Sequence, residues 1–373
     1  MRIGVDTRIF FNEKIPLFRN YTILLLQQLT QQYSQYRFFT FTTDEDQTIL
    51  KDIENITSIC ITPRSVNLVS LKLWYDVKLP LALKKYKIDV LICPNGICSL
   101  TTGVPQILLF QHFNFDKKNS SFTGLSFVRK YNSSFIKKAK NIATVSREIK
   151  DKITDEHKTE LQKVIVSGLG APALFKPIEW EEKEAIKEQL VDGFEYFIFT
   201  AGLHPAANVI NVLKAFSIFK KWQKSGMKLV IVAFDNKFLQ AELDKLSTYK
   251  YRKDVIIKTD LPDEDAVKLI TASYAVIHTP SSNQFISPVL EALAGSVPII
   301  ATMGNGMREV AAEGALYVNP AKPEEIAEAM KTIFKDENLR SKLIENGKLQ
   351  AAKFSLAKSI QNISQLIDLA VSG

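Results

Sequence analysis

Short apolar runs recur along the chain, and segments with helical periodicity separate many of them. The runs form two series, one before residue 147 and one after residue 195, with the loop 167–180 between them. Such runs are typical of strands in parallel sheets that helices cover on both faces. The sequence therefore predicts an α/β protein with two doubly wound, Rossmann-like domains. The expected strands are 2–6, 37–43, 58–63, 90–94, 105–112 and 141–146, then 196–202, 228–234, 254–259, 274–279, 297–302 and 315–319.

The length of the chain, 373 residues, suits two domains that each bury a core of their own. We expect an N-terminal domain over 1–172, a C-terminal domain over 173–355, and a final helical segment over 356–373. The chain is 46% hydrophobic and 24% charged, which is the composition of a globular protein.

Cysteine usage and hydropathy bear on the compartment. Cys60, Cys93 and Cys98 form no CxxC pair, so we expect reduced thiols and no zinc site. No apolar run approaches the roughly 18 to 20 residues of a spanning helix. The opening MRIGVDTRIF passes from charged residues directly into a strand, unlike a secretory signal. These features predict a cytoplasmic protein.

Positive charge is concentrated in the first half of the chain. Residues 1–175 hold 24 Lys and Arg against 15 Asp and Glu, and the remainder holds 24 against 25, in agreement with the net charge of +8. This asymmetry favours an anionic partner, such as membrane phospholipid or a lipid-phosphate acceptor, although solvated helix faces give the same counts. No nucleic-acid-binding motif appears, so nucleic acid is not an expected partner.

The segment 121–140 concentrates this charge. It places Phe122, Leu125, Val128, Tyr131 and Phe135 at helical spacing beside several lysines. The pattern fits an interfacial helix at the inner membrane face, and it also fits a helix packed on a sheet with a basic outer face, which is the commoner case.

The segment 278–301, HTPSSNQFISPVLEALAGSVPIIA, has the strongest functional signal. It predicts a strand end, a loop, a helix that starts near Pro288, a turn at Gly295 and another strand. The N-terminus of that helix directs free N–H groups and a positive dipole end at the loop, where a phosphate fits. Glu291, one turn into the helix, can accept paired hydrogen bonds from a ribose diol.

The same segment resembles the nucleotide-sugar motif of retaining group 1 (family 4) glycosyltransferases, Glu-Gly-Phe-Gly-Leu-Pro-x-Leu-Glu-Ala. The register here is Asn283-Gln284-Phe285-Ile286-Ser287-Pro288-Val289-Leu290-Glu291-Ala292. The second Glu is kept, Asn283 replaces the first, and both glycines are absent. The resemblance implies the GT-B fold, in which two Rossmann-like domains flank a cleft and the last helix crosses back to the N-terminal domain.

The resemblance also implies roles for individual residues. His112 and Asn283 take the catalytic positions, Arg19 and Tyr21 lie on the acceptor or phosphate side, and no metal or other cofactor is expected. The donor-binding positions that it implies are Gly202, Phe285, Ser287 and Glu291. His204 and Arg308 match no family position, and we expect them as donor-binding substitutes for cations of the family that are missing here.

Further positions depart from the family pattern. The Arg and Lys that neutralise the donor diphosphate are replaced by Ala206 and Ala207. The first-domain turn 15–21 keeps Arg19 and Tyr21 but contains no glycine, so its backbone cannot approach a phosphate as closely. Phe113 stands where a family His-Asp pair has its Asp.

The resemblance therefore predicts a glycosyltransferase that moves a sugar from a nucleotide-sugar donor to a saccharide or lipid-linked acceptor, with retention. The alternative is a catalytically degenerate GT-B homologue that serves as a binding or partner subunit, because one missing oxyanion donor typically lowers a rate by about 10²–10³-fold.

Overall fold

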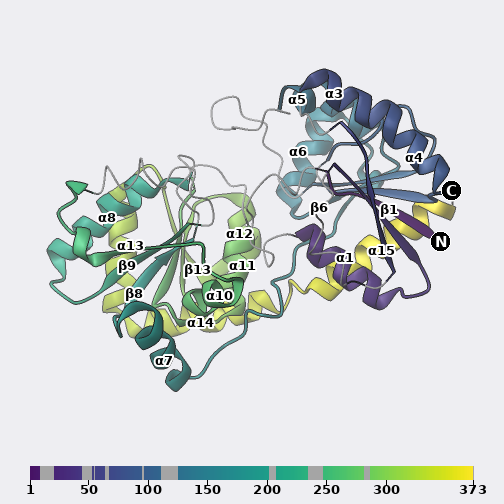
Figure 1. Ribbon diagram of the computed structural model, residues 1–373. Helices are drawn as coiled ribbons and strands as arrows, with labels where there is room; N and C mark the ends of the chain where they lie inside the picture. The colour runs from purple at the N-terminus through teal and green to yellow at the C-terminus, as the bar shows by residue number, and fades with distance from the viewer. Residues whose placement is uncertain are drawn as a thin grey trace. The chain divides into compact units, whose positions relative to one another are not determined.

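A computed structural model describes residues 1–8, 21–43, 53, 55–63, 67–94, 96–110, 125–200, 207–233, 247–280 and 286–372. The chain divides into two compact units (Figure 1). The first unit holds the described residues up to Gly168 and the C-terminal segment from Ala357, and the second holds Leu169–Leu356. These limits lie a few residues from those expected at 172 and 355.

The first unit is built on a parallel sheet in the order β3-β2-β1-β4-β5-β6-β7. Its central strand β1 pairs with β2 on one side and β4 on the other, so Val5 lies beside Thr40 and Ile92. Most residues of these central strands are buried, because helices cover both faces of the sheet. The strands are β1 (Arg2–Asp6), β2 (Arg37–Thr42), β3 (Ile56–Cys60), β4 (Val90–Cys93), β5 (Gln106–Phe110), β6 (Asn141–Thr144) and β7 (Val164–Val166).

The helices of the first unit are α1 (Tyr21–Gln32), α3 (Leu68–Leu73), η3 (Trp74–Lys78), α4 (Leu79–Lys85), α5 (Leu125–Lys138), α6 (Arg147–His157), η4 (Leu161–Lys163) and α15 (Leu356–Ser372). Helix α5 belongs to the segment 121–140, for which the sequence left open an interfacial helix or a helix packed on a sheet. Phe127, Val128 and Phe135 are buried, so α5 packs into the unit.

The segments α3, η3 and α4 follow one another without a break, and η3 is a π-helical turn. Pro80 accounts for that turn. Proline has no N–H to give to the carbonyl of Asp76, and its ring clashes with an α-helical carbonyl at that position. The N–H of the preceding residue, Leu79, donates to the carbonyl of Trp74, five residues back, which is the hydrogen bond of a π turn. The Asp76 carbonyl accepts a hydrogen bond of 2.6 Å from the Thr101 hydroxyl, which satisfies it.

The second unit has a parallel sheet in the order β10-β9-β8-β11-β12-β13. The strands are β8 (Tyr196–Phe199), β9 (Lys228–Ala233), β10 (Val255–Thr259), β11 (Ala275–His278), β12 (Ile299–Thr302) and β13 (Ala315–Val318). Its helices are α7 (Trp180–Val191), α8 (Val209–Trp222), η7 (Arg252–Asp254), α10 (Asp263–Ala272), α11 (Ser287–Ala294), α12 (Asn305–Ala311), η8 (Ala312–Gly314), α13 (Pro323–Lys335) and α14 (Glu337–Ala351). The prediction of an α/β protein with two parallel sheets is confirmed.

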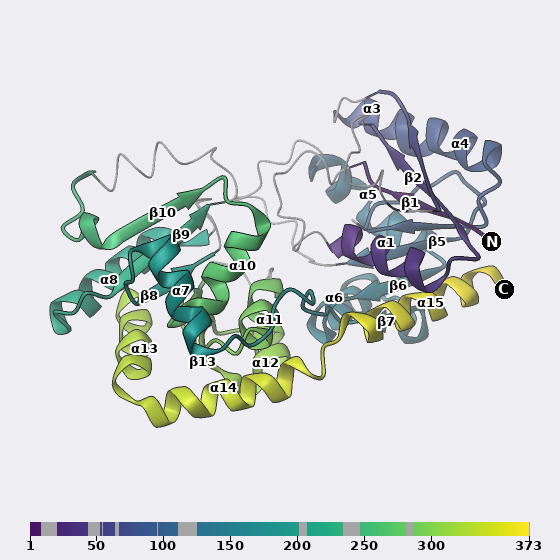
Figure 2. The same cartoon turned by 60° about the horizontal axis from the view of Figure 1, so that its bottom comes forward.

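Helix α15 lies in the first unit, where it appears in yellow beside α1 (Figure 2). Its apolar face, which includes Ile360, Ile363 and Ile367, is buried. The buried hydroxyl of Tyr21 shares a hydrogen bond with Ser359, which also donates to the Gly168 carbonyl at 3.1 Å. These contacts hold α15 to the start of α1 and to the segment that follows β7.

Candidate functional site

The carboxyl ends of β8 and β11 mark the topological switch point of the second sheet. The chain continues from β8 to β9 on one side, while β11 lies on the other side of β8, so the loops after the two strands diverge. Ligands of open α/β sheets bind at such a point. The described residues do not include 201–206 and 281–285, which contain the predicted site residues Gly202, His204, Asn283 and Phe285.

Helix α11 begins at this edge and carries two of the predicted donor-binding residues. Ser287 is its first residue and is half-buried, whereas Glu291, one turn later, is fully buried. The Ser287 hydroxyl donates to the Glu291 carboxylate at 2.8 Å. Ile286 at the N-cap provides no side-chain hydrogen bond, so the N-terminus of α11 lacks a capping side chain among the described residues. A carboxylate is therefore held next to backbone N–H groups that a phosphate can use.

Asn208 connects backbone segments near this switch point. Its backbone has a left-handed conformation, with φ of 71°, at the N-cap of α8. Its side-chain amide donates to the Thr279 carbonyl at 3.0 Å and to the Pro320 carbonyl at 2.7 Å. Asn211 donates to the same Pro320 carbonyl at 3.1 Å. Asn208 thus links the segments that follow β8, β11 and β13.

Several helices direct their N-termini at the carboxyl edge of this sheet. In a parallel α/β unit each helix that follows a strand starts at that edge, as α8, α11, α12 and α13 do after β8, β11, β12 and β13. Each N-terminus carries a partial positive charge of about half an elementary charge. The edge therefore has positive potential that comes from backbone dipoles.

Arg308 lies on the exposed side of α12. Its guanidinium carbon is 4.8 Å from the centre of the Tyr317 ring, a cation–π arrangement on the edge strand β13. Burial raises the pKa of the Tyr317 hydroxyl to about 12, and that hydroxyl donates to the Ala312 carbonyl at 2.7 Å. A donor-binding role for Arg308 stays a prediction.

Of the predicted site residues in the N-terminal part of the chain, the structure describes Tyr21 alone. Tyr21 is buried, burial raises the pKa of its hydroxyl, and Ser359 is its hydrogen-bond partner. This contact gives Tyr21 a structural role in holding α15, and a role beside the acceptor or phosphate stays a prediction. Arg19 and His112 lie outside the part of the chain that the structure describes.

The sequence interpretation missed a buried polar cluster at the carboxyl end of β1. The Asp6 carboxylate accepts hydrogen bonds from the Tyr75 hydroxyl at 2.8 Å and from the Arg8 backbone N–H at 3.0 Å. Burial raises the pKa of Asp6 to about 6, against the opposing effect of these donors and of the Arg8 charge. The Arg8 guanidinium lies over the Trp74 ring at 5.2 Å.

This cluster lies at the first sheet's own topological switch point, since the sheet order continues from β1 to β2 on one side and to β4 on the other. The sequence signal for this cluster was the run of polar residues at the end of a buried first strand. The partner Tyr75 comes from a distant helix, which no local pattern indicates.

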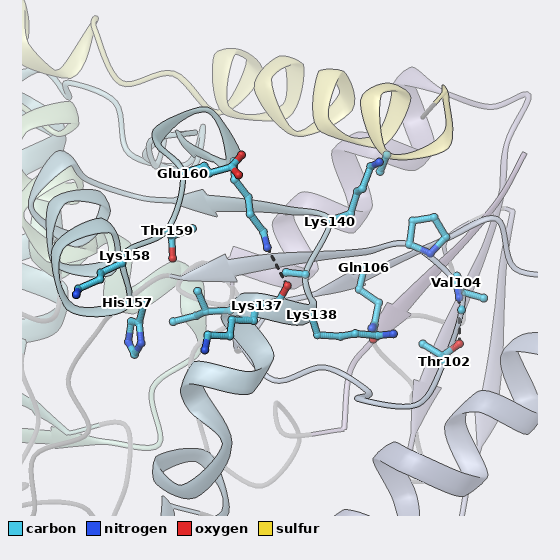
Figure 3. Close-up of a pocket in the computed structure, with 16 residues that line it drawn as sticks. Thr102, Val104, Gln106, Lys137, Lys138, Lys140, His157, Lys158, Thr159 and Glu160 are labelled. Atoms are coloured by element: carbon cyan, nitrogen blue, oxygen red, sulfur yellow. Dashed lines mark hydrogen bonds between the residues drawn. The ribbon is translucent and has the colours of Figure 1, made fainter.

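A basic pocket of about 600 Å³ lies at the opposite, amino-terminal edge of the first sheet (Figure 3). Five lysines and one glutamate line it, the lysines being Lys137, Lys138, Lys140, Lys158 and Lys163. Lys163 donates to the Lys137 carbonyl at 3.0 Å, at the end of α5. Figure 3 shows Lys140 extending toward α15 and Lys158 at the other end of the pocket.

Lysines near the C-termini of α5 and α6 stabilise the helix dipoles there, which explains part of this charge. His157 also lines the pocket, and burial lowers its pKa. The pocket can attract anions, but it lies at the edge of the sheet opposite Asp6.

The described residues contain no group of three or more His, Cys, Asp or Glu side chains placed to hold a metal ion. Among the helices described, none combines the length and apolar character that crossing a membrane requires.

Known proteins resemble the chain in sequence over part of its length. Residues 181–350 match the model of the family described as "Glycosyl transferases group 1". The O-antigen chain mannosyltransferase RfbU of Salmonella typhimurium is 23% identical over 198 residues, which are 53% of this chain and 52% of that protein. The alignment thus spans about half the length of that curated relative.

The likeness to solved structures extends over nearly the whole chain. A glycosyltransferase from Rickettsia africae has a TM-score of 0.78 and 18% identity, over 99% of this chain and 98% of that chain. The Anabaena protein HepE in complex with UDP-glucose has a TM-score of 0.76 and 14% identity, over 99% of each chain. At these identities the likeness shows the fold, and it confirms the expected GT-B class with its two Rossmann-like sheets.

Proposed function

We propose, on the premise that residues 181–350 belong to the family of group 1 glycosyl transferases, that this chain transfers a sugar from a nucleotide-sugar donor to a saccharide or lipid-linked acceptor, with retention. The observation that carries the proposal is α11, which starts at the carboxyl edge of the second sheet and holds Glu291 one turn inside. The names of the similar proteins, a mannosyltransferase and a UDP-glucose complex, support a nucleotide-sugar as the donor class.

In this proposal the donor lies against the second unit. Its phosphates accept hydrogen bonds at the N-terminus of α11, and its ribose diol donates to the Glu291 carboxylate, which Ser287 orients. Gly202 and Phe285 line the donor pocket, and Asn283 bonds to a sugar hydroxyl. As a neutral group, Asn283 does so more weakly than the Glu of the family motif.

Transfer breaks the bond between the anomeric carbon and the diphosphate oxygen and forms one from that carbon to an acceptor hydroxyl oxygen. The electron pair of the broken bond goes to the diphosphate, which also takes the proton of the acceptor hydroxyl. Groups that stabilise this developing charge carry much of the catalysis. We assign that work to Arg19, His204 and Arg308 together with the helix N-termini at the sheet edge, and we include no metal ion. His112 contacts the donor sugar, and Tyr21 belongs to the acceptor side.

The same proposal places the chain in the cytoplasm, with peripheral contact at the inner membrane face and no nucleic-acid partner. The excess of Lys and Arg in residues 1–175 supports an anionic surface or acceptor for the first unit.

One observation favours the alternative of a non-catalytic partner subunit. Ala207, at the position of the family's Lys, is 5% exposed and belongs to the hydrophobic core of the second unit. A lysine there would bury an ammonium group, which is costly unless the group is paired. The second sheet is thus packed around a small apolar residue at a position where the family carries a cation.

Donor turnover tests the proposal. We expect the wild type to hydrolyse at least one of UDP-glucose, GDP-mannose and ADP-glucose. Arg19, His204 and Arg308 are replaced with Ala one at a time. At least one of these replacements should lower the rate of donor hydrolysis by about 100-fold, as for other oxyanion-stabilising donors. Arg37→Ala, at the exposed amino end of β2, is the control.

Wild-type turnover that survives all three replacements would contradict this account of charge compensation. Donor binding without any turnover would instead favour the partner-subunit alternative.

A further inference from the structure

One face of the helix formed by α3, η3 and α4 exposes apolar side chains to solvent. Val69 is 76% exposed, Leu73 40%, Val77 46% and Leu81 62%. These residues are four positions apart, slightly more than the 3.6 residues of an α-helical turn, so in a regular α-helix they would drift around the axis. The wider π turn of η3 compensates for this drift. The four side chains therefore form one continuous stripe along the helix.

The opposite face fixes the orientation of this helix. Leu71, Trp74, Tyr75, Leu79 and Leu83 are all essentially buried in the first unit. The Trp74 indole N–H also donates to the Ile61 carbonyl at 3.0 Å. Rotating the helix to hide the stripe would expose these larger side chains, so the stripe is a fixed part of the surface.

Positive charge accompanies the stripe. Lys72, Lys78, Lys84 and Lys85 are exposed on the same helix. Asp76 is the one acidic residue of this helix, and its side chain is 7% exposed. Its carboxylate forms an ion pair with Lys72 at 3.1 Å and accepts a hydrogen bond from the Leu100 N–H at 2.8 Å. The exposed surface is thus apolar along its centre and cationic beside it.

We propose that this surface, the α3–α4 face (Val69, Leu73, Val77 and Leu81 with Lys72, Lys78, Lys84 and Lys85), docks on an anionic phospholipid bilayer. Apolar side chains that enter the headgroup boundary and lysines that contact acidic lipids are the two components of interfacial helix binding. The lysines select this occupant over a second copy of the chain, because pairing two such faces would bring like charges together. The inference rests on the proposed function, which includes peripheral membrane contact, and deepens it by naming the surface that makes this contact.

Vesicle co-sedimentation of the full chain tests this assignment without a sugar donor. We expect binding to vesicles of equimolar phosphatidylglycerol and phosphatidylcholine to be about tenfold stronger than to phosphatidylcholine alone. The triple variant Val69→Gln, Leu73→Gln and Leu81→Gln should reduce binding by about tenfold, as should the double variant Lys78→Glu and Lys85→Glu. The replaced side chains are exposed, so the thermal midpoint should stay close to that of the wild type.

Matched controls come from the second unit. Leu349→Gln removes a leucine that is 66% exposed on α14, and Lys342→Glu with Lys348→Glu reverses two exposed charges on the same helix. These variants should bind vesicles as the wild type does.

Absence of wild-type binding to the acidic vesicles would overturn the proposal, as would undiminished binding of the folded triple variant. Dimers that sediment without lipid and disappear in the triple variant would assign the face to a second copy instead. Donor hydrolysis, measured without vesicles, reports separately on the transferase proposal.

Discussion

Single residues in this chain acquire their chemistry from partners that are distant in sequence. Asp6 ends the buried strand β1, and burial raises its pKa, although the hydrogen bond from Tyr75 of η3 acts in the opposite direction. Arg308 was predicted as a cation near the donor, and its guanidinium lies over the Tyr317 ring. The sequence could place these residues at sheet edges, but it could not predict their neighbours, because those contacts depend on tertiary packing.

Asp6 makes folding stability depend on pH. Its pKa is raised from 3.8 to about 6 in the folded chain, so the folded state favours the protonated carboxyl. This contribution to stability is present below pH 3.8 and is lost as the pH rises through about 6, by about 3 kcal/mol at most. Asp6→Asn has no such proton to lose. Its stability relative to the wild type should therefore be greater at pH 7 than at pH 4.

Urea unfolding at the two pH values measures this difference, with Asp89→Asn as the control for removing a carboxylate from the same unit. An equal difference between Asp6→Asn and the wild type at both pH values would contradict the predicted burial effect.

Helices and strands were predictable to different degrees. The twelve apolar runs match strands in sheets, apart from their ends, because a buried parallel strand has a composition that is readable locally. The helical segment 121–140 could not be assigned to a membrane or a sheet, since both environments accept one apolar face. The exposed stripe on α3–α4 was not predicted, because apolar residues occur on both faces of that helix and only tertiary packing shows which face is covered.

The two connections between the units make a close contact that depends on a glycine. A Cβ atom added to Gly170 would lie 2.0 Å from the Leu356 nitrogen and 2.4 Å from its Cα. Backbone atoms cannot move aside as a flexible side chain can, so Gly170→Ala should cost about 2 kcal/mol or more. The thermal midpoint should fall by several degrees.

Gly103→Ala is the matched control, because a Cβ atom there would meet nothing within 4 Å. Its thermal midpoint should stay close to that of the wild type. If the two alanine variants melt together, the connecting segments do not touch as the structure places them.

At the scale of the whole molecule, two series of strands and helices predicted two Rossmann-like domains, and the fold comparison confirms that class. The function is less readable, because the motifs that bind the donor in the family are partly replaced here. Several predicted site residues, among them His112 and Asn283, also lie outside the described residues. Glu291 and Ser287 are the part of the predicted site that the structure does bring together, at 2.8 Å.

Titration of the chain with UDP-, GDP- and ADP-sugars is the most direct test of the central claim, that the second unit binds a nucleotide-sugar at the N-terminus of α11. We predict that at least one donor raises the stability of the wild type, by about 2.7 kcal/mol at 100 times its Kd. Glu291→Gln, which keeps the shape of the side chain, should weaken that donor by about 10- to 100-fold, the value of a hydrogen bond to a charged group. Failure of every donor to bind, or equal affinity in a folded Glu291→Gln variant, would contradict the claim.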